Sequence, residues 1–566
     1  MKKVLSFVVM LSLMASLAAC GSSAAVSKSS SSVDDEVVGM ETEAAEETAV
    51  PDDTEETAVP ETEEEETAVP DVETEVSDEV VDADSVDPIT IAVTTDYEPL
   101  ETGEERWDWV NTEIPSLDEE TAEKYPVIAK AIGSFADELT ALGKKEASDI
   151  TAALEESPSD EMFYSDTKLT IKRADSTAVS FLERRESYMG GAHPNVWYET
   201  RTIDSATGTI LDINDILNDP ASLPGILAPL VEETAGTDQL IVDSVEQVIR
   251  DEMDPQKEDY KLDYTLSYDG ITFWFSPYEM TSYAAGDVVV KLPYAEYPDL
   301  VKEEYAAVPE NYFLPVSEYE QVLLPDGSAY FSWFWGEGED YDERDLHMTT
   351  AADYSYKTVE EKKKSGAVSG LTDVSFKIRS YTNNAFLMQV DGKTFFIFEA
   401  SMDDDYSQLH MFDISDPAAP KELPVMSRYF GKGNPSNPKK VYLAHGVDIL
   451  STYTAGRYYS FDGSGNALPL SEWDDIILYN PSMYNVTLKQ DTGFPKVDPE
   501  TLEAGEIVNL SKGTKLTFIR TDSEKTVDMQ TEDGTVVRIT QEGEEWPRTV
   551  NDIPTEDLFE GMMYAG

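Results

Sequence analysis

Residues 21–88 cannot form a packed domain, so they fix where folding of this chain begins. The segment holds 24 acidic residues, one basic residue (Lys28) and no aromatic residue. The sequence Glu-Glu-Thr-Ala-Val-Pro recurs in it at Glu46, Glu55 and Glu65. Such a composition buries too little apolar surface to offset chain entropy, and each repeat contains a proline that disfavours helix. We therefore predict an acidic disordered linker at 21–88 and a folded part from residue 89.

The first 20 residues have the order of an export signal. Lys2 and Lys3 precede an apolar run at residues 4–15, and small residues come before Cys20, the one cysteine of the chain. The ending resembles the lipobox of bacterial lipoproteins, in which Cys20 would receive fatty acyl chains such as palmitate. An ordinary cleaved signal with a chance cysteine is the alternative. We expect a lipid-anchored protein on the extracellular face of the cell membrane of a Gram-positive bacterium.

Charge and cysteine content limit the classes of partner. A single cysteine cannot form an internal disulfide, so the exported domains must rely on their cores. The formal charge of −73 excludes nucleic acid as a partner, because a phosphate backbone requires a basic surface. Acidity favours a cationic partner or divalent cations, or serves only to keep the protein in solution. No later stretch has the apolar length of a transmembrane helix, so the expected membrane contact is the N-terminal lipid.

Periodicity after residue 89 predicts several domains. Helical patterns occupy residues 116–156, 240–253 and 555–559, and strand patterns recur between them. Expected strands lie at 88–93, 168–179, 197–203, 271–275, 288–292, 329–335, 385–390, 393–399, 409–414, 441–443, 457–461, 476–479, 506–510, 514–521, 526–531 and 535–540. Helices and strands come in blocks without regular alternation, which favours an α+β domain with an antiparallel sheet.

The pattern of the residues after 308 predicts mainly β structure. Residues 409–417 look like one β-propeller repeat, and Asp533-Gly534 occupies a hairpin position. We predict a multidomain chain in which a β-rich, propeller-derived region and a small SH3-like β-barrel follow the α+β domain. The expected parts are a lipoprotein signal peptide at 1–20, the linker at 21–88, the α+β extracellular domain at 89–308, the β-rich domain at 309–498 and the small β domain at 499–566.

Four blocks of residues carry a resemblance to a known family. They are residues 188–195 (Tyr-Met-Gly-Gly-Ala-His-Pro-Asn), 202–208, 275–279 (Phe-Ser-Pro-Tyr-Glu) and 283–286 (Tyr-Ala-Ala-Gly). In order and spacing they resemble the extracellular domain of lysozyme-sensing anti-sigma factors of the RsiV type. The same domain precedes the catalytic domain of PdaC-type peptidoglycan deacetylases. The resemblance implies an α+β binding module with lysozyme or a cell-wall component as ligand.

The ligand-binding residues that we predict lie in these blocks. Paired glycines permit unusual backbone angles, the proline after His193 favours extended backbone there, and tyrosines offer large contact area at low entropy cost. The alternative is structural: a glycine bulge, a histidine that caps a core, and tyrosines packed beneath a loop. The predicted set is Gly190, Gly191, His193, Pro194, Asn195, Pro277, Tyr278 and Tyr283.

Nothing in the sequence favours catalysis, a metal or another cofactor. The histidines at 193, 347, 410 and 445 are separated by at least 35 residues, and no nucleophile elbow or phosphate-binding glycine loop occurs. Acidic runs at 403–405 and 462–466 lack the spacing of an EF-hand loop and read better as a solvated loop and a hairpin turn. We expect a non-catalytic binding protein. An accessory protein or enzyme of peptidoglycan modification, and a purely structural surface component, are the alternatives.

Overall fold

The computed structural model describes most of the chain after residue 85. The described residues are 86–100, 108–156, 161–257, 261–318, 320–323, 329–337, 344–352, 371–378, 380, 384–401, 407–477, 485–543 and 546–564. The predicted signal, Cys20, residues 21–85 of the predicted linker and the acidic run at 403–405 lie outside these residues. The last residues of the predicted linker belong to the folded part, because the Asp87 N–H donates to Ser176 Oγ at 3.0 Å and the Asp87 carboxylate pairs with Lys124 at 3.2 Å.

The first sheet is mixed, not purely antiparallel as predicted. Its order is β1-β2-β3-β4-β5, and β2 pairs with β3 in parallel while the other pairs are antiparallel. A helical crossover joins β2 to β3, and such a connection allows two successive strands to run in the same direction. The strands are β1 (Ala92–Pro99), β2 (Trp109–Ser116), β3 (Tyr164–Ala174), β4 (Ala178–Tyr188) and β5 (Asn195–Asp204).

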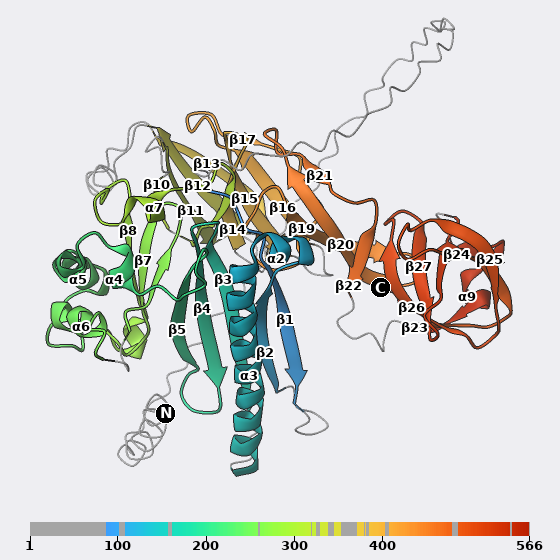
Figure 1. Ribbon diagram of the computed structural model, residues 1–566, viewed down its shortest axis with the longest axis horizontal. Helices are drawn as coiled ribbons and strands as arrows, with labels where there is room; N and C mark the ends of the chain where they lie inside the picture. Colours follow the sequence, from blue (N-terminus) through green and yellow to red (C-terminus); the bar gives the residue numbers. More distant parts are fainter. Residues whose placement is uncertain are drawn as a thin grey trace, which may run out of the picture. The chain divides into compact units, whose positions relative to one another are not determined.

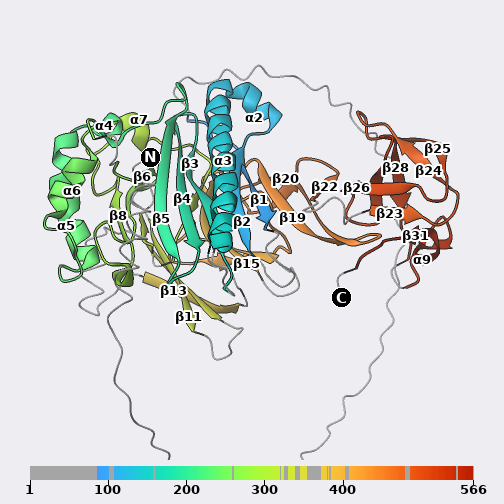
Figure 2. The ribbon, with the colours of Figure 1, turned by 90° about the horizontal axis from the view of Figure 1, so that it is seen from below.

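The crossover consists of two helices, α2 (Glu119–Lys124) and α3 (Pro126–Glu156), where the sequence predicts one helical stretch at 116–156. Asp118 caps α2 by accepting a hydrogen bond from the Thr121 N–H at 2.9 Å. Proline at the first position of α3 suits a helix start, where no intrahelical donor is needed. Figures 1 and 2 show α3 lying along the sheet. Its buried side chains, Ile128, Ile132, Phe135 and Leu139, share a core with apolar residues of β1, β3, β4 and β5.

Residues 205–308 form a second α+β layer around their own core. The expected strands at 271–275 and 288–292 are confirmed in a three-stranded antiparallel sheet, whereas the expected helix at 240–253 is shorter because Ser244 caps it. The elements are α4 (Ile213–Ile216), η1 (Pro220–Ser222), α5 (Leu223–Ala235), α6 (Val245–Glu252), β6 (Tyr264–Leu266), β7 (Gly270–Phe275), η2 (Tyr283–Ala285), β8 (Val288–Pro293) and α7 (Glu303–Ala306). In Figure 1 α5 and α6 lie beside this sheet.

Two antiparallel sheets follow, with orders β10-β11-β12-β13 and β17-β16-β15-β14-β9. Buried residues of both sheets, among them Phe331, Trp333, Phe396 and Phe398, form one core, so the sheets pack face to face. The strands are β9 (Tyr312–Pro315), β10 (Val322–Leu323), β11 (Ala329–Glu337), β12 (Arg344–Ala352), β13 (Leu371–Ile378), β14 (Asn384–Val390), β15 (Lys393–Ser401), β16 (Ser407–Asp413) and β17 (Lys421–Glu422).

The last sheet runs in the order β18-β19-β20-β22-β26-β27-β28-β24-β25. Its elements are β18 (Tyr429–Phe430), β19 (Val441–Asp448), β20 (Thr452–Phe461), β21 (Ala467–Pro469), β22 (Asp474–Ile477), β23 (Asn485–Leu488), β24 (Thr492–Val497), β25 (Ala504–Leu510), β26 (Lys515–Thr521), β27 (Thr526–Thr531), β28 (Val536–Thr540), β29 (Thr549–Val550), β30 (Ile553–Pro554), α9 (Thr555–Leu558) and β31 (Phe559–Glu560).

The described strands form neither a propeller nor a closed barrel. β22 pairs with β20 on one side and with β26 on the other, so the sheet continues from one module into the next. Strands β23 and β24 precede residue 499 and pair with β26 and β28, so the expected boundary at 499 falls within a continuous sheet. The propeller-like residues 409–417 form β16 and the turn after it, in a sheet of five strands. The chain is therefore a multidomain β-rich protein with several antiparallel sheets and an α+β N-terminal region.

Candidate functional site

The structure brings the two predicted ligand-binding segments together. The loop between β4 and β5 carries His193, and the loop between β7 and β8 carries Tyr278 and Tyr283. The His193 and Tyr283 rings are stacked, with centroids 3.5 Å apart and an interplanar angle of 13°. The Tyr278 ring lies 5.9 Å from that of Tyr283. We call these three side chains the aromatic cluster.

Glycine allows the first loop to turn tightly. Gly190 and Gly191 have φ values of 88° and 117°, in a region that other residues rarely adopt. Both are exposed, whereas His193, Pro194 and Asn195 are half-buried. The Tyr188 hydroxyl donates to the carbonyl oxygen of Gly191 at 3.1 Å and holds the loop. The bulge alternative thus describes the glycines, but His193 stacks on the second loop instead of capping a core.

The second loop holds a tyrosine in strained backbone. Tyr278 has a φ of 73° and a side chain that is 42% exposed. Its N–H donates to the Thr281 carbonyl at 2.9 Å, and the Ser276 N–H donates to Glu279 Oε2 at 2.8 Å. A bulky residue keeps a strained backbone only where the surrounding contacts impose it. Burial of the Tyr278 side chain contributes little here, because the side chain is exposed. The loop therefore presents Tyr278 to solvent, while Pro277 is half-buried beside it.

Contacts from β5 fix the second loop to the first sheet. The Tyr198 N–H donates to Ser276 Oγ at 3.0 Å, and the Tyr198 hydroxyl donates to Asp287 Oδ2 at 3.0 Å. The Tyr198 ring also packs on Trp274, with centroids 5.4 Å apart. Burial, with Asp287 as a further cause, raises the pKa of Tyr198 to about 12. Tyr198 therefore stays neutral and positions the two loops relative to each other.

The surroundings of the second loop are apolar and acidic. The Ile241 N–H donates to the Met280 carbonyl at 2.9 Å, and the Ile241 side chain is 53% exposed. Burial, together with Glu279 and Asp263, raises the pKa of Glu252 to about 8. The exposed Tyr278 ring, the exposed isoleucine and the exposed carboxylates of Glu279 and Asp287 suit contact with a partner that combines apolar area with positive charge.

Sequence reasoning missed several residues that build this site. Tyr198, Asp287 and Ile241 act through contacts between segments far apart in the chain, and their local patterns gave no sign of it. The expected helix at 240–253 placed Ile241 within a helix, so its exposure beside the second loop gave no separate signal.

His445 and the acidic run at 462–466, which the sequence does not favour as sites, hold local structure. His445 Nε2 lies 3.1 Å from Ser523 Oγ, and that hydroxyl donates to Asp474. The carboxylate of Asp462 accepts hydrogen bonds from Ser464 N–H and Asn466 N–H, so the run at 462–466 is a hairpin turn. Within the described part of the chain, no group of three or more His, Cys, Asp or Glu side chains is placed to hold a metal ion. Among the described helices, none has both the length and the apolar character needed to cross a bilayer.

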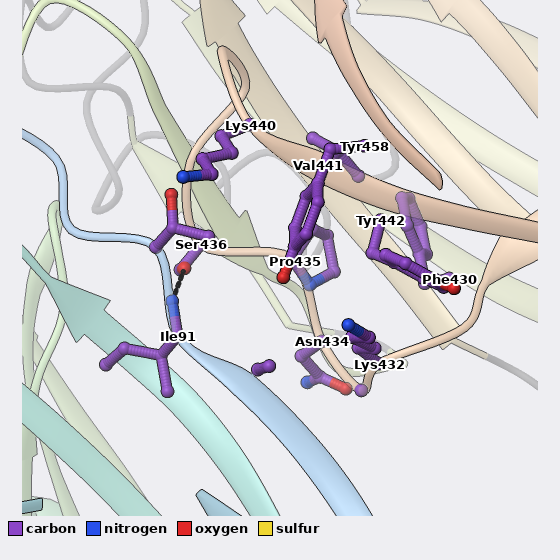
Figure 3. Close-up of a pocket in the computed structure, with 13 residues that line it drawn as sticks. Ile91, Phe430, Lys432, Asn434, Pro435, Ser436, Lys440, Val441, Tyr442 and Tyr458 are labelled. Atoms are coloured by element: carbon purple, nitrogen blue, oxygen red, sulfur yellow. Dashed lines mark hydrogen bonds between the residues drawn. The ribbon is translucent and has the colours of Figure 1, made fainter. Parts of the chain in front are cut away.

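A small pocket lies between the first sheet and the last one (Figure 3). The Ile91 N–H donates to Ser436 Oγ at 3.1 Å, and Lys432 Nζ lies 4.1 Å from the ring centroid of Tyr442 and 5.1 Å from that of Tyr458. The cavity volume is about 20 Å³, which is room for one water molecule. This pocket joins two parts of the chain and is too small for an organic ligand.

Comparisons with known proteins agree with part of the resemblance. Residues 215–295 match the model of a family described as "Protein of unknown function (DUF3298)". The matched range includes the second loop and ends two residues after β8, and the first loop lies before it. No curated protein matches the chain.

Two solved structures of DUF3298 family proteins are similar in part. The protein from Pseudomonas aeruginosa PAO1 has 15% sequence identity and a TM-score of 0.27, and the match covers 39% of this chain and 97% of that one. The protein from Bacteroides fragilis has 18% identity and a TM-score of 0.26, with 39% and 94% covered. The family match at residues 215–295 fits the expected extracellular domain in broad terms.

Proposed function

We propose that this protein is a non-catalytic cell-surface lipoprotein whose α+β region binds an extracellular ligand through the aromatic cluster. The ligand is a basic protein such as lysozyme, and the anchor is a lipid on Cys20. The observation that carries the proposal is the stacking of His193 on Tyr283 beside the exposed, strained Tyr278. Two loops distant in sequence converge there on one surface, as a binding site requires.

The charges near the cluster support a basic protein over an anionic ligand. Glu279 and Asp287 are both exposed in the second loop, and the whole chain has a formal charge of −73. Such a surface attracts cationic proteins at long range, while rigid tyrosines supply contact area with little entropy cost. Wall glycan is the second candidate, because the ring face of Tyr278 is available for stacking against a sugar.

Calorimetry tests the proposal with the full-length protein in detergent. We expect lysozyme to bind at about 0.15 M salt, where screening removes nonspecific charge pairing. Replacing the two ring contacts in Tyr278→Ala/Tyr283→Ala should weaken binding by about tenfold or more, because central aromatic residues dominate such interfaces. Tyr97→Ala is the matched control, since Tyr97 is 54% exposed on β1 and lies outside the site.

Two results would contradict lysozyme recognition. One is equal binding of cytochrome c, a basic protein of another fold, and the other is equal affinity of the double variant and the Tyr97 control. A third result would identify wall glycan as the ligand instead of lysozyme. In that case lysozyme gives no heat of binding, and soluble wall glycan fragments bind saturably and lose affinity when Tyr278 is replaced.

A further inference from the structure

A second, larger pocket lies far along the chain from the aromatic cluster. It has a volume of about 490 Å³ and lies between residues 423–428, which connect β17 to β18, and the turn between β20 and β21. Leu423, Met426 and Ala467 line it and also pack against the core beneath. The walls are therefore largely apolar, and the volume is within the range of small-molecule sites.

One cation lines this pocket without an opposing charge. The Arg428 guanidinium lies over the Tyr459 ring, 5.0 Å from its centroid. Among the described residues, Nη1 of Arg428 is buried without a hydrogen-bond partner. This is unusual in a chain with 114 acidic residues, because an unsatisfied buried donor costs free energy.

The neighbouring arginine shows the contrast. Arg457 also lies against Tyr459, at 5.7 Å, but its Nε is 3.1 Å from Asp474 Oδ1 and its Nη1 donates to the Ser471 carbonyl at 2.8 Å. Arg457 therefore has a carboxylate and a backbone carbonyl as partners and serves the fold. Arg428 is held in place by the same ring and keeps its capacity for an anion.

We propose that this pocket binds a small organic monocarboxylate, with Arg428 as the partner of the carboxylate and the apolar wall in contact with the rest of the ligand. One planar guanidinium matches one carboxylate. A ligand with several negative charges is disfavoured, because the pocket offers a single cation within a strongly acidic protein. The volume suits a body of about one or two sugar rings or a short acylated peptide.

Two wall-derived carboxylates fit this chemistry, and the experiment separates them. The full-length protein in detergent, with carbon-13 on its methionine methyl groups, is titrated with N-acetylmuramic acid, with N-acetylglucosamine and with acetyl-D-alanyl-D-alanine. N-acetylglucosamine is the sugar without the carboxylate, and the peptide is the carboxylate without the sugar. We expect a saturable shift of the Met426 methyl signal with at least one carboxylate and none with N-acetylglucosamine.

Substitutions at Arg428 identify the cation. Arg428→Gln should weaken carboxylate binding by about tenfold or more, whereas Arg428→Lys, which keeps the charge, should retain part of it. Lys421→Gln, an exposed cation on β17 outside the pocket, is the matched control. The Tyr278→Ala/Tyr283→Ala protein should bind the carboxylate normally, so failure of lysozyme recognition leaves this test intact. Three outcomes would overturn the proposal. They are equal shifts of the Met426 methyl signal with both sugars, no saturation with either carboxylate, and unchanged carboxylate affinity in Arg428→Gln.

Discussion

Glu252 shows how burial changes the charge of a single residue beside the aromatic cluster. Its carboxyl is half-buried at the C-terminal end of α6, and burial, with Glu279 and Asp263, raises its pKa to about 8. Glu320 has the opposite outcome. Burial alone would raise its pKa, but Lys291 and Lys172 lower it to about 2. Neighbouring charge therefore decides which buried carboxyl is ionised.

The raised pKa of Glu252 predicts a pH-dependent stability. Between about pH 4.5 and pH 8 the unfolded chain has lost this proton and the native protein keeps it, so the free energy of unfolding falls as pH rises through that window. Glu252→Gln removes this slope and should stabilise the protein by on the order of 2 kcal/mol at pH 8, with little effect near pH 4. Urea unfolding at several pH values measures it, with Glu233→Gln on α5 as an exposed control. An unchanged pH slope in Glu252→Gln would contradict the assignment.

At the scale of elements, the sequence predicts what short-range patterns determine. The helix period predicts the helical stretch at 116–156 that forms α2 and α3, and Asp533-Gly534 marks the turn between β27 and β28, where Gly534 has a φ of 86°. The predicted strand at 168–179 is wrong as one element, because a turn splits it into β3 and β4. There Asp175 Oδ1 accepts hydrogen bonds from the Thr177 and Ala178 N–H groups, a role typical of aspartate in turns.

Pairing between distant segments could not be predicted in this way. The parallel β2–β3 pair, the continuation of β20 through β22 into β26, and the stacking of His193 on Tyr283 all depend on tertiary contacts. Local alternation identifies a strand without identifying its neighbour, so a barrel and an open sheet look alike in sequence. The sequence therefore predicted His193, Tyr278 and Tyr283 one by one, but neither their convergence nor the contacts of Tyr198, Asp287 and Ile241.

The edge of the first sheet gives a prediction at this scale. Ser436 Oγ accepts from the Ile91 N–H at 3.1 Å and donates to the Ile89 carbonyl at 2.9 Å, and the side chain is buried. Ser436→Ala leaves both backbone groups unsatisfied and should lower the free energy of unfolding by about 1–3 kcal/mol. Ser511→Ala, at an exposed serine, is the control. Equal denaturation midpoints for the two variants would show that this bridge contributes nothing to stability.

At the scale of the whole molecule, our proposal assigns membrane attachment to the N-terminus. In that proposal the acidic residues at 21–88 act as a linker between the membrane and the folded part. A formal charge of −73 also opposes adsorption to anionic lipid. Membrane attachment in our proposal therefore depends on the lipid at Cys20 and on no other feature that we assign.

This dependence makes the anchor testable with one substitution. Cys20→Ala removes the only thiol that a lipid can modify, so the protein should leave the membrane fraction and appear in the medium, or remain unprocessed with a larger mass. Fractionation followed by mass spectrometry of the N-terminal peptide distinguishes these outcomes. Ser22→Ala, two residues further on, is the matched control and should stay membrane-bound. Two observations together would refute the lipid anchor: Cys20→Ala still requires detergent for extraction, and it has the mass of the native mature protein. A partner in the envelope would then retain the protein.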